Sequence, residues 1–119
     1  MKKRISAFRY AFQGISLGLK TEFHLKVHVI LAITAAFAGW YFEISRFEWM
    51  IVLICIGMVL SAELFNSAVE RLANRITMEK DPLIGAAKDL AAGAVLITAV
   101  ISLVIGIIIF LPHLWALIT

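Results

Sequence analysis

Three long apolar segments fill most of this 119-residue chain. The segment from Met50 to Leu60 carries no charged residue, and a further apolar run lies on each side of it. Hydrophobic residues make up 62% of the chain, and the mean hydropathy is +0.96, far above the norm for globular proteins. A soluble protein of this size could not bury so much apolar surface. The sequence therefore predicts one integral membrane domain, residues 1–119, of the all-α class.

The lengths of the apolar runs predict three transmembrane helices. A straight helix needs about 20 residues to cross a hydrocarbon core of about 30 Å. The helices that contain the three spans are expected over about 22–42, 47–75 and 82–111. Asp81 and Pro82 are a strong start signal for the last helix, because Asp accepts hydrogen bonds from free N–H groups and Pro is tolerated at the first position. We expect Pro112 to end that helix.

The distribution of basic residues predicts the orientation of these spans. Of the 11 lysines and arginines, six precede the first apolar run, four lie between the second and third, and only Arg46 lies between the first and second. Cytoplasmic loops carry the excess of Lys and Arg, so the N-terminus and the segment 71–88 are predicted to be cytoplasmic in a multi-pass protein. Because these charges flank membrane spans, we do not expect nucleic-acid binding.

Residues 5–20 have the pattern of a helix that lies on the membrane surface. Apolar side chains fall on one helical face, namely Ile5, Phe8, Phe12, Ile15 and Leu19. Basic and amide side chains fall largely elsewhere, which places cations near anionic headgroups. A targeting peptide or a disordered tail explains the regular aromatic stripe less well. The sequence therefore predicts an N-terminal interfacial amphipathic helix.

Polar side chains continue the second apolar run on one helical face. Spacings of three and four residues bring Glu63, Asn66, Glu70 and Asn74 to the same side of an α-helix. Carboxylates that extend a membrane helix are costly, so they normally face a partner, a water-filled cavity or a bound ion. The pattern indicates a functional site.

Further charged residues are expected at the same membrane face, namely Glu22, Lys88 and Asp89. Mg²⁺ takes oxygen ligands, usually one or two carboxylates plus substrate phosphates. A lysine can neutralise phosphate charge, and a remaining carboxylate can act as a general base. These groups permit phosphoryl transfer onto a lipid. From spacing alone, salt bridges of Glu63 and Glu70 to Arg71, Arg75 or Lys88 at a solvated helix end remain an equally open interpretation.

Several common sites are absent from the sequence. There is no GxxxxGK[ST] loop and no GxGxxG motif, which excludes a conventional nucleotide-binding fold. There is no HExxH motif and no Cys/His cluster. His24 and His28 are four residues apart, but two histidines alone make a poor zinc site. We interpret both as interfacial polar residues.

Two motifs carry a resemblance to a known family. Residues 63–70 read ELFNSAVE and residues 87–96 read AKDLAAGAVL. Together they resemble the prokaryotic diacylglycerol kinase/undecaprenol kinase family, over nearly the whole chain. The resemblance implies a three-span subunit of a homotrimer in the bacterial cytoplasmic membrane, with composite active sites between neighbouring subunits. It also implies transfer of phosphate from MgATP to a lipid alcohol, diacylglycerol or undecaprenol.

The resemblance also implies roles for individual residues. By motif position, Glu63 is similar to the general base, and Glu22 and Glu70 are similar to the metal ligands. ATP contacts are implied at Lys3, Tyr10, Glu22, Asn66, Glu70, Glu79, Lys80, Asp81, Lys88 and Asp89. Asn74 stands where an aspartate is common, which argues against a charge-dependent role there. The segment 21–28 (TEFHLKVH) is more similar to the undecaprenol kinase branch.

Two non-enzymatic functions are alternatives to a lipid kinase. Membrane carboxylates also line ion paths, so the chain could form an oligomeric ion conductor. Such a path predicts carboxylates near the middle of the bilayer, whereas these map to the cytoplasmic end. A membrane adaptor that recruits a partner through its cytoplasmic helices is the other alternative, and it does not require Glu63, Asn66 and Glu70.

Overall fold

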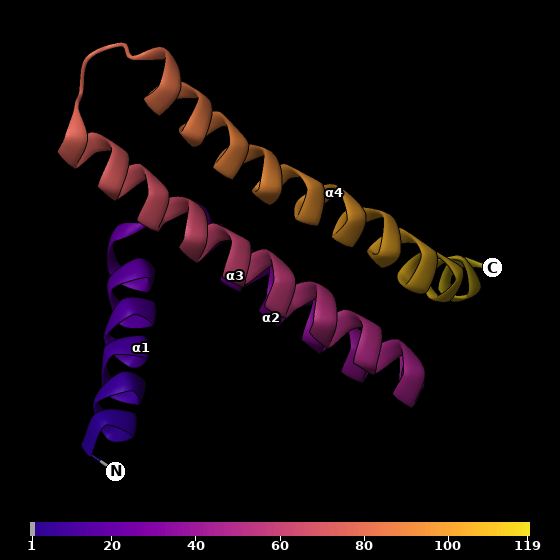
Figure 1. Ribbon diagram of the computed structural model, residues 1–119. Helices are drawn as coiled ribbons and strands as arrows, with labels where there is room; N and C mark the ends of the chain where they lie inside the picture. The colour runs from indigo at the N-terminus through magenta and orange to yellow at the C-terminus, as the bar shows by residue number, and fades with distance from the viewer. Residues whose placement is uncertain (1) are drawn as a thin grey trace.

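The structure is a computed structural model that describes residues 2–119, all of whose regular elements are helices (Figure 1). These are α1 (Lys2–Thr21), α2 (Phe23–Tyr41), α3 (Arg46–Ile76) and α4 (Pro82–Ile118). Within the described residues, α2, α3 and α4 are long and apolar enough to cross a membrane. The predicted all-α class is confirmed, and so are three apolar helices of the length that a membrane span requires.

The long helix α3 is the centre of the molecule. It packs against α4 and against α2, and Figure 1 shows α4 running beside α3 while α1 leaves the other helices at a steep angle. The molecule is accordingly flat, with extents of 56 × 41 × 22 Å. Most large apolar side chains are exposed, which is the expected state of surfaces that face lipid or another subunit.

The turn between α2 and α3 is built by local hydrogen bonds. The Ser45 hydroxyl accepts from the backbone N–H of Glu48 at 3.1 Å, and the Glu48 carboxylate accepts from the backbone N–H of Ser45 at 3.0 Å. This capping box satisfies two free donors at the start of α3. A Cβ on Gly39 would lie 2.9 Å from the Trp49 ring, so the absence of a side chain permits the close approach of the two helices.

The main apolar cluster lies at this same end of the molecule. Its buried members are Ile44, Val52 and Ile109, which come from the turn, α3 and α4. The ring of Phe42 stacks on His113 of α4 with centroids 5.5 Å apart. The helices are therefore tied together near the α2–α3 turn.

The start of α4 forms as the sequence predicts, but its end does not. The Asp81 carboxylate accepts hydrogen bonds from the N–H groups of Leu83 and Ile84 at 2.9 and 3.1 Å, and Pro82 is the first helical residue. The expectation that Pro112 ends the helix is wrong, because α4 continues to Ile118.

The physical reason is that Pro112 removes only one backbone donor, a loss that apolar membrane helices tolerate. The residues that follow are mostly apolar and remain helical. The stacking of His113 on Phe42 also holds the first turn beyond the proline against the end of α2. Tertiary contact thus favours continuation of the helix over termination.

The N-terminal helix is slightly longer than the predicted segment 5–20, because α1 covers Lys2–Thr21. Its junction with α2 is the extended residue Glu22 (φ −103°, ψ 111°). Gly18 is buried there, and a Cβ on it would lie 2.8 Å from Leu25 Cδ2 and 3.0 Å from Leu64 Cδ2. Gly18 therefore packs closely against α2 and α3 where α1 meets them.

Candidate active site

Glu63 is the one buried polar or charged residue in the part of the chain that the structure describes, with 5% of its surface exposed. It lies on α3 where the apolar run becomes polar. His28 of α2 faces it, with Nε2 at 3.2 Å from Glu63 Oε1. Burying a carboxylate without a partner is very costly, so this contact helps to stabilise Glu63 inside the protein.

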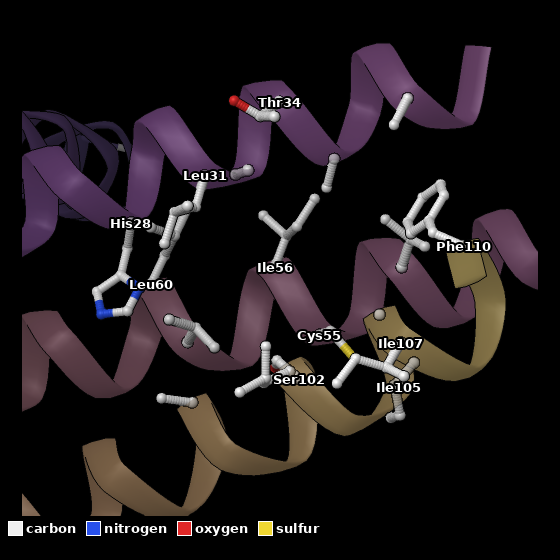
Figure 2. Close-up of a pocket in the computed structure, with 18 of the residues that line it drawn as sticks. His28, Leu31, Thr34, Cys55, Ile56, Leu60, Ser102, Ile105, Ile107 and Phe110 are labelled. Carbon is white, nitrogen blue, oxygen red and sulfur yellow. The ribbon is translucent and has the colours of Figure 1, made fainter. Parts of the chain in front are cut away.

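The structure gives His28 a contact that the sequence did not predict, the one with Glu63. Figure 2 shows its ring directed from α2 toward α3, at one end of an apolar cavity. One sequence feature pointed toward this contact: His28 lies four residues after His24, near the start of the apolar span that precedes Glu63 along the chain. The sequence does not show how α2 is rotated about its axis relative to α3, and this rotation decides whether His28 faces Glu63. His24, by contrast, is exposed.

Asn66 and Glu70 form a second group further along α3. Asn66 Nδ2 donates to Glu70 Oε1 at 3.4 Å. The other amide atom, Asn66 Oδ1, is buried and finds no hydrogen-bond partner among the described residues. Buried polar atoms are nearly always satisfied, so this oxygen is available to accept a hydrogen bond from a bound group or to coordinate a cation.

Glu22 lies in a third group, at the junction of α1 and α2. The Arg71 guanidinium donates to Glu22 Oε1 through Nη2 at 3.1 Å and Nε at 3.3 Å, and to Thr21 Oγ1 at 2.9 Å. Arg71 thus ties the junction to α3. A cavity of about 490 Å³ lies between α1 and α3, and Glu22, Arg71 and Ser61 are among its lining residues.

The three groups do not form a complete metal site within one chain. Among residues 2–119, no three His, Cys, Asp or Glu side chains are placed to hold a metal ion together. Glu22 is paired with Arg71, and Glu70 accepts from Asn66. The donors are nevertheless oxygens, and Mg²⁺ needs only one or two carboxylates when water and phosphates complete its shell. The donor chemistry therefore fits a hard cation, with Asn66 Oδ1 as a further free oxygen.

The remaining candidate residues lie outside this cluster. Lys88 is half-buried and Asp89 is exposed in the first turns of α4. Exposed residues also include Glu79, Lys80 and Asp81, in the α3–α4 connection, and Lys3 and Tyr10, on α1. Figure 1 shows the N-terminal end of α1 far from the start of α4. One chain does not bring all of these side chains together.

An apolar cavity of about 620 Å³ separates α2 from α4 (Figure 2). Its walls come from α2, α3 and α4, and are formed largely by aliphatic side chains such as Leu31, Ile56 and Ile105. His28 lies at one end and Phe110 at the other. The cavity therefore reaches the residue that contacts Glu63.

Comparison with known proteins gives the chain a family. The model of the prokaryotic diacylglycerol kinase family matches residues 9–110. The undecaprenol kinase of Bacillus subtilis (strain 168) is 41% identical over 114 residues, covering 96% of this chain and 93% of that protein.

Two diacylglycerol kinases are more distant relatives. The protein from Haemophilus influenzae is 29% identical over 107 residues, which cover 89% of this chain and 91% of the relative. The protein from Escherichia coli (strain K12) is 24% identical over 109 residues, with 92% and 89% covered. The match of one family model to most of the chain agrees with the three apolar helices and with the resemblance carried by the two motifs. This chain therefore belongs to the prokaryotic diacylglycerol kinase family, and it is a lipid kinase of a bacterial membrane.

Proposed function

We propose that this protein transfers phosphate from ATP to the hydroxyl group of a membrane lipid alcohol, and that undecaprenol is its preferred acceptor over diacylglycerol. The buried Glu63 carboxylate at the end of an apolar span carries the proposal. The 41% identity to an undecaprenol kinase, against 29% and 24% to two diacylglycerol kinases, favours the acceptor. Ion conduction and partner recruitment are less well supported, because neither accounts for this family.

Glu63 acts as the general base in this proposal. A carboxylate at hydrogen-bond distance from an attacking hydroxyl can accept its proton as the bond to phosphorus forms. Glu63 is suited to this role because it is buried where apolar and polar parts of α3 meet. A lipid hydroxyl can reach that depth without its hydrocarbon chain leaving the membrane.

ATP binds, in this proposal, through residues of α1, α3 and α4 and of the α1–α2 and α3–α4 connections. Glu22 and Glu70 would hold Mg²⁺, which when bound neutralises charge on the transferred phosphate. Asn66 offers its free Oδ1 beside Glu70, and Lys88 offsets phosphate charge from the second turn of α4. Further nucleotide contacts are proposed for Lys3, Tyr10, Glu79, Lys80, Asp81 and Asp89.

The active site is proposed to be composite, built between neighbouring subunits of a homotrimer. Two features support this: one chain leaves the proposed ATP contacts dispersed, and it exposes most of its large apolar side chains. We further propose that α1 lies in the interface of the cytoplasmic leaflet, with the N-terminus in the cytoplasm. Its exposed apolar face, which includes Phe8 and Phe12, supports this placement.

The test is a radiolabelled phosphate transfer assay in mixed micelles that contain undecaprenol or diacylglycerol. The wild-type protein should phosphorylate undecaprenol with the higher kcat/KM. Glu63→Gln should lower kcat by a factor of about 10² to 10⁴, the usual contribution of a general base, while the oligomer stays intact. Glu43→Gln, in the exposed α2–α3 turn, is the matched control and should keep the wild-type rate.

Each part of the proposal has its own contradicting result. A Glu63→Gln protein with the wild-type kcat contradicts the base assignment. Equal or higher kcat/KM with diacylglycerol contradicts the acceptor preference. Failure of the wild-type protein to label either lipid contradicts the proposed reaction.

A further inference from the structure

We propose that His28 is a positioning residue for catalysis: its Nε2–H group donates to Glu63 Oε1 and holds that carboxylate in the orientation that the reaction requires. The proposal rests on the proposed role of Glu63 as the base. His28 itself touches neither lipid nor phosphate in this scheme. It acts only through Glu63.

Glu63 has one ionisable partner. Among the described residues, His28 is the one side chain within ion-pair distance of the Glu63 carboxylate, with Nε2 and Oε1 3.2 Å apart. The two side chains are 20% and 6% exposed, respectively. A glutamate has three rotatable bonds, so an unheld carboxylate would sample several orientations. A base needs to be placed within about 0.5 Å of its productive position, and the histidine supplies that restraint.

The two oxygens of the Glu63 carboxylate have different surroundings. His28 Nε2 lies 3.2 Å from Oε1, so the proposed hydrogen bond takes Oε1 and leaves Oε2 to accept the proton of a substrate hydroxyl. Many catalytic bases are oriented in this way by a third group that makes no contact with substrate. The helical backbone of α2 fixes the ring from a separate element, so movement of α3 alone does not displace it.

The ring of His28 lies at one end of the apolar cavity between α2 and α4 (Figure 2). None of the proposed ATP contacts lines that cavity. Loss of the ring should therefore change the chemical step more than the binding of ATP. This gives the proposal a kinetic signature that a general loss of stability does not produce.

The proposal needs a hydrogen on Nε2, and it does not need a charge. Neutral imidazole protonated at Nε2 and imidazolium both donate from that atom. A glutamine amide nitrogen reaches about the same place as Nε2, whereas the shorter asparagine reaches about as far as Nδ1. Glutamine should therefore replace histidine and asparagine should not.

The experiment compares His28→Gln, His28→Asn and His28→Leu in the same lipid kinase assay. We expect kcat to fall about 10- to 100-fold in the Asn and Leu variants, the usual loss when a supporting hydrogen bond is removed. The Gln variant should keep a kcat within about threefold of wild type, and KM for ATP should change less than about twofold in all three. Oligomer size and helical circular dichroism verify folding. His24→Leu, on the exposed side of the same helix, is the control and should match wild type.

The outcomes separate this proposal from the proposed function. If wild type labels lipid and His28→Leu keeps its kcat, positioning by His28 is overturned while the kinase stands. If His28→Gln is as slow as His28→Leu in folded protein, the hydrogen bond is not the cause and the proposal is again overturned. If wild type labels no lipid, the proposed function fails first, and the role of His28 fails with it.

Discussion

Burial of Glu63 has to be offset by specific contacts, because a carboxylate in an apolar helix bundle loses its hydration. The structure supplies His28 on one side, and the turn that follows along α3 carries Asn66 with a free buried oxygen. The polar groups of Glu63 and Asn66 therefore lie on successive turns of one helix, α3. The carboxylate with a histidine partner is suited to proton transfer, and the amide with a free oxygen is suited to an ion or a phosphate-bound water.

The Asn66 side chain should affect the dependence of kinase activity on Mg²⁺ more than the use of the lipid substrate. Replacing it in Asn66→Leu removes the free Oδ1 and the hydrogen bond to Glu70. We expect the Mg²⁺ concentration for half-maximal activity to rise about tenfold, the usual effect of losing a supporting ligand group. A magnesium titration of kinase rate measures this change. Asn74→Leu, exposed on the same stripe, should leave the titration unchanged; an equal shift in both variants would contradict the assignment.

Arg71 should stabilise the α1–α2 junction because its planar guanidinium carries several hydrogen-bond donors. It holds Glu22 and Thr21 at once, a geometry that a lysine ammonium does not reproduce. Arg71→Lys should therefore loosen the α1–α2 junction, although the exposed pair contributes only about 1 kcal/mol or less to stability. Faster protease cleavage near residues 21–22 in detergent is the expected result. Arg75→Lys, in the last turn of α3, is the control, and equal cleavage of both variants would contradict this role.

At the scale of elements, the junction of α1 with the spanning helices depends on close packing at one glycine. Gly14 and Gly18 lie on the same face of α1, yet only a Cβ at Gly18 would meet neighbouring atoms within 4 Å. A bulkier residue at Gly18 has to displace Leu25 or Leu64. The angle at which α1 leaves the molecule in Figure 1 therefore depends on packing that helix propensity does not encode.

These two glycines make a matched pair for mutation. Gly18→Val should lower stability by about 1 to 3 kcal/mol, because overpacking displaces neighbouring side chains. Gly14→Val should change stability by about 0.5 kcal/mol or less, since nothing lies within 4 Å of a Cβ there and valine is no worse a helix former than glycine. Thermal unfolding midpoints in one detergent compare them. Equal midpoints for the two variants would show that contact at Gly18 does not constrain α1.

At the scale of the whole molecule, one chain is a flat arrangement with little buried core. Its buried apolar residues are few, and the cavity between α2 and α4 remains lined with exposed aliphatic surface. Such a subunit is suited to association within the bilayer. The residues proposed to bind ATP are dispersed over the chain, which is a second reason to propose sites that two subunits share.

Mixed oligomers test whether Glu63 and Lys88 of one site come from different subunits. Glu63→Gln and Lys88→Ala proteins should each be nearly inactive alone. After co-reconstitution, exchange of subunits should restore a measurable fraction of wild-type activity, because some sites combine an intact Glu63 with an intact Lys88. Self-mixing of each variant is the control. If mixed oligomers stay inactive although exchange is shown by fluorescence transfer, both residues of a site belong to one chain.

Prediction from the sequence succeeded where local chemistry is decisive. Asp81 and Pro82 start α4 because a cap and a fixed φ act within one turn. Prediction failed at Pro112, where α4 continues and His113 stacks on Phe42. It did not foresee the contact of His28 with Glu63, because the two residues lie on different helices. In the candidate site, the shared stripe of Glu63 and its neighbours was readable, but the orientation of each side chain was not.

The amino-acid sequence alone determined that the chain forms three apolar helices with carboxylates near the end of the second, because partitioning of apolar residues and helical periodicity depend on composition and spacing. Only the tertiary structure decided that His28 contacts Glu63, that Arg71 pairs with Glu22, and that Gly18 of α1 packs against Leu25 and Leu64. Those contacts join residues far apart in the chain. They depend on how each helix is rotated and shifted against its neighbours, which packing decides and local sequence does not.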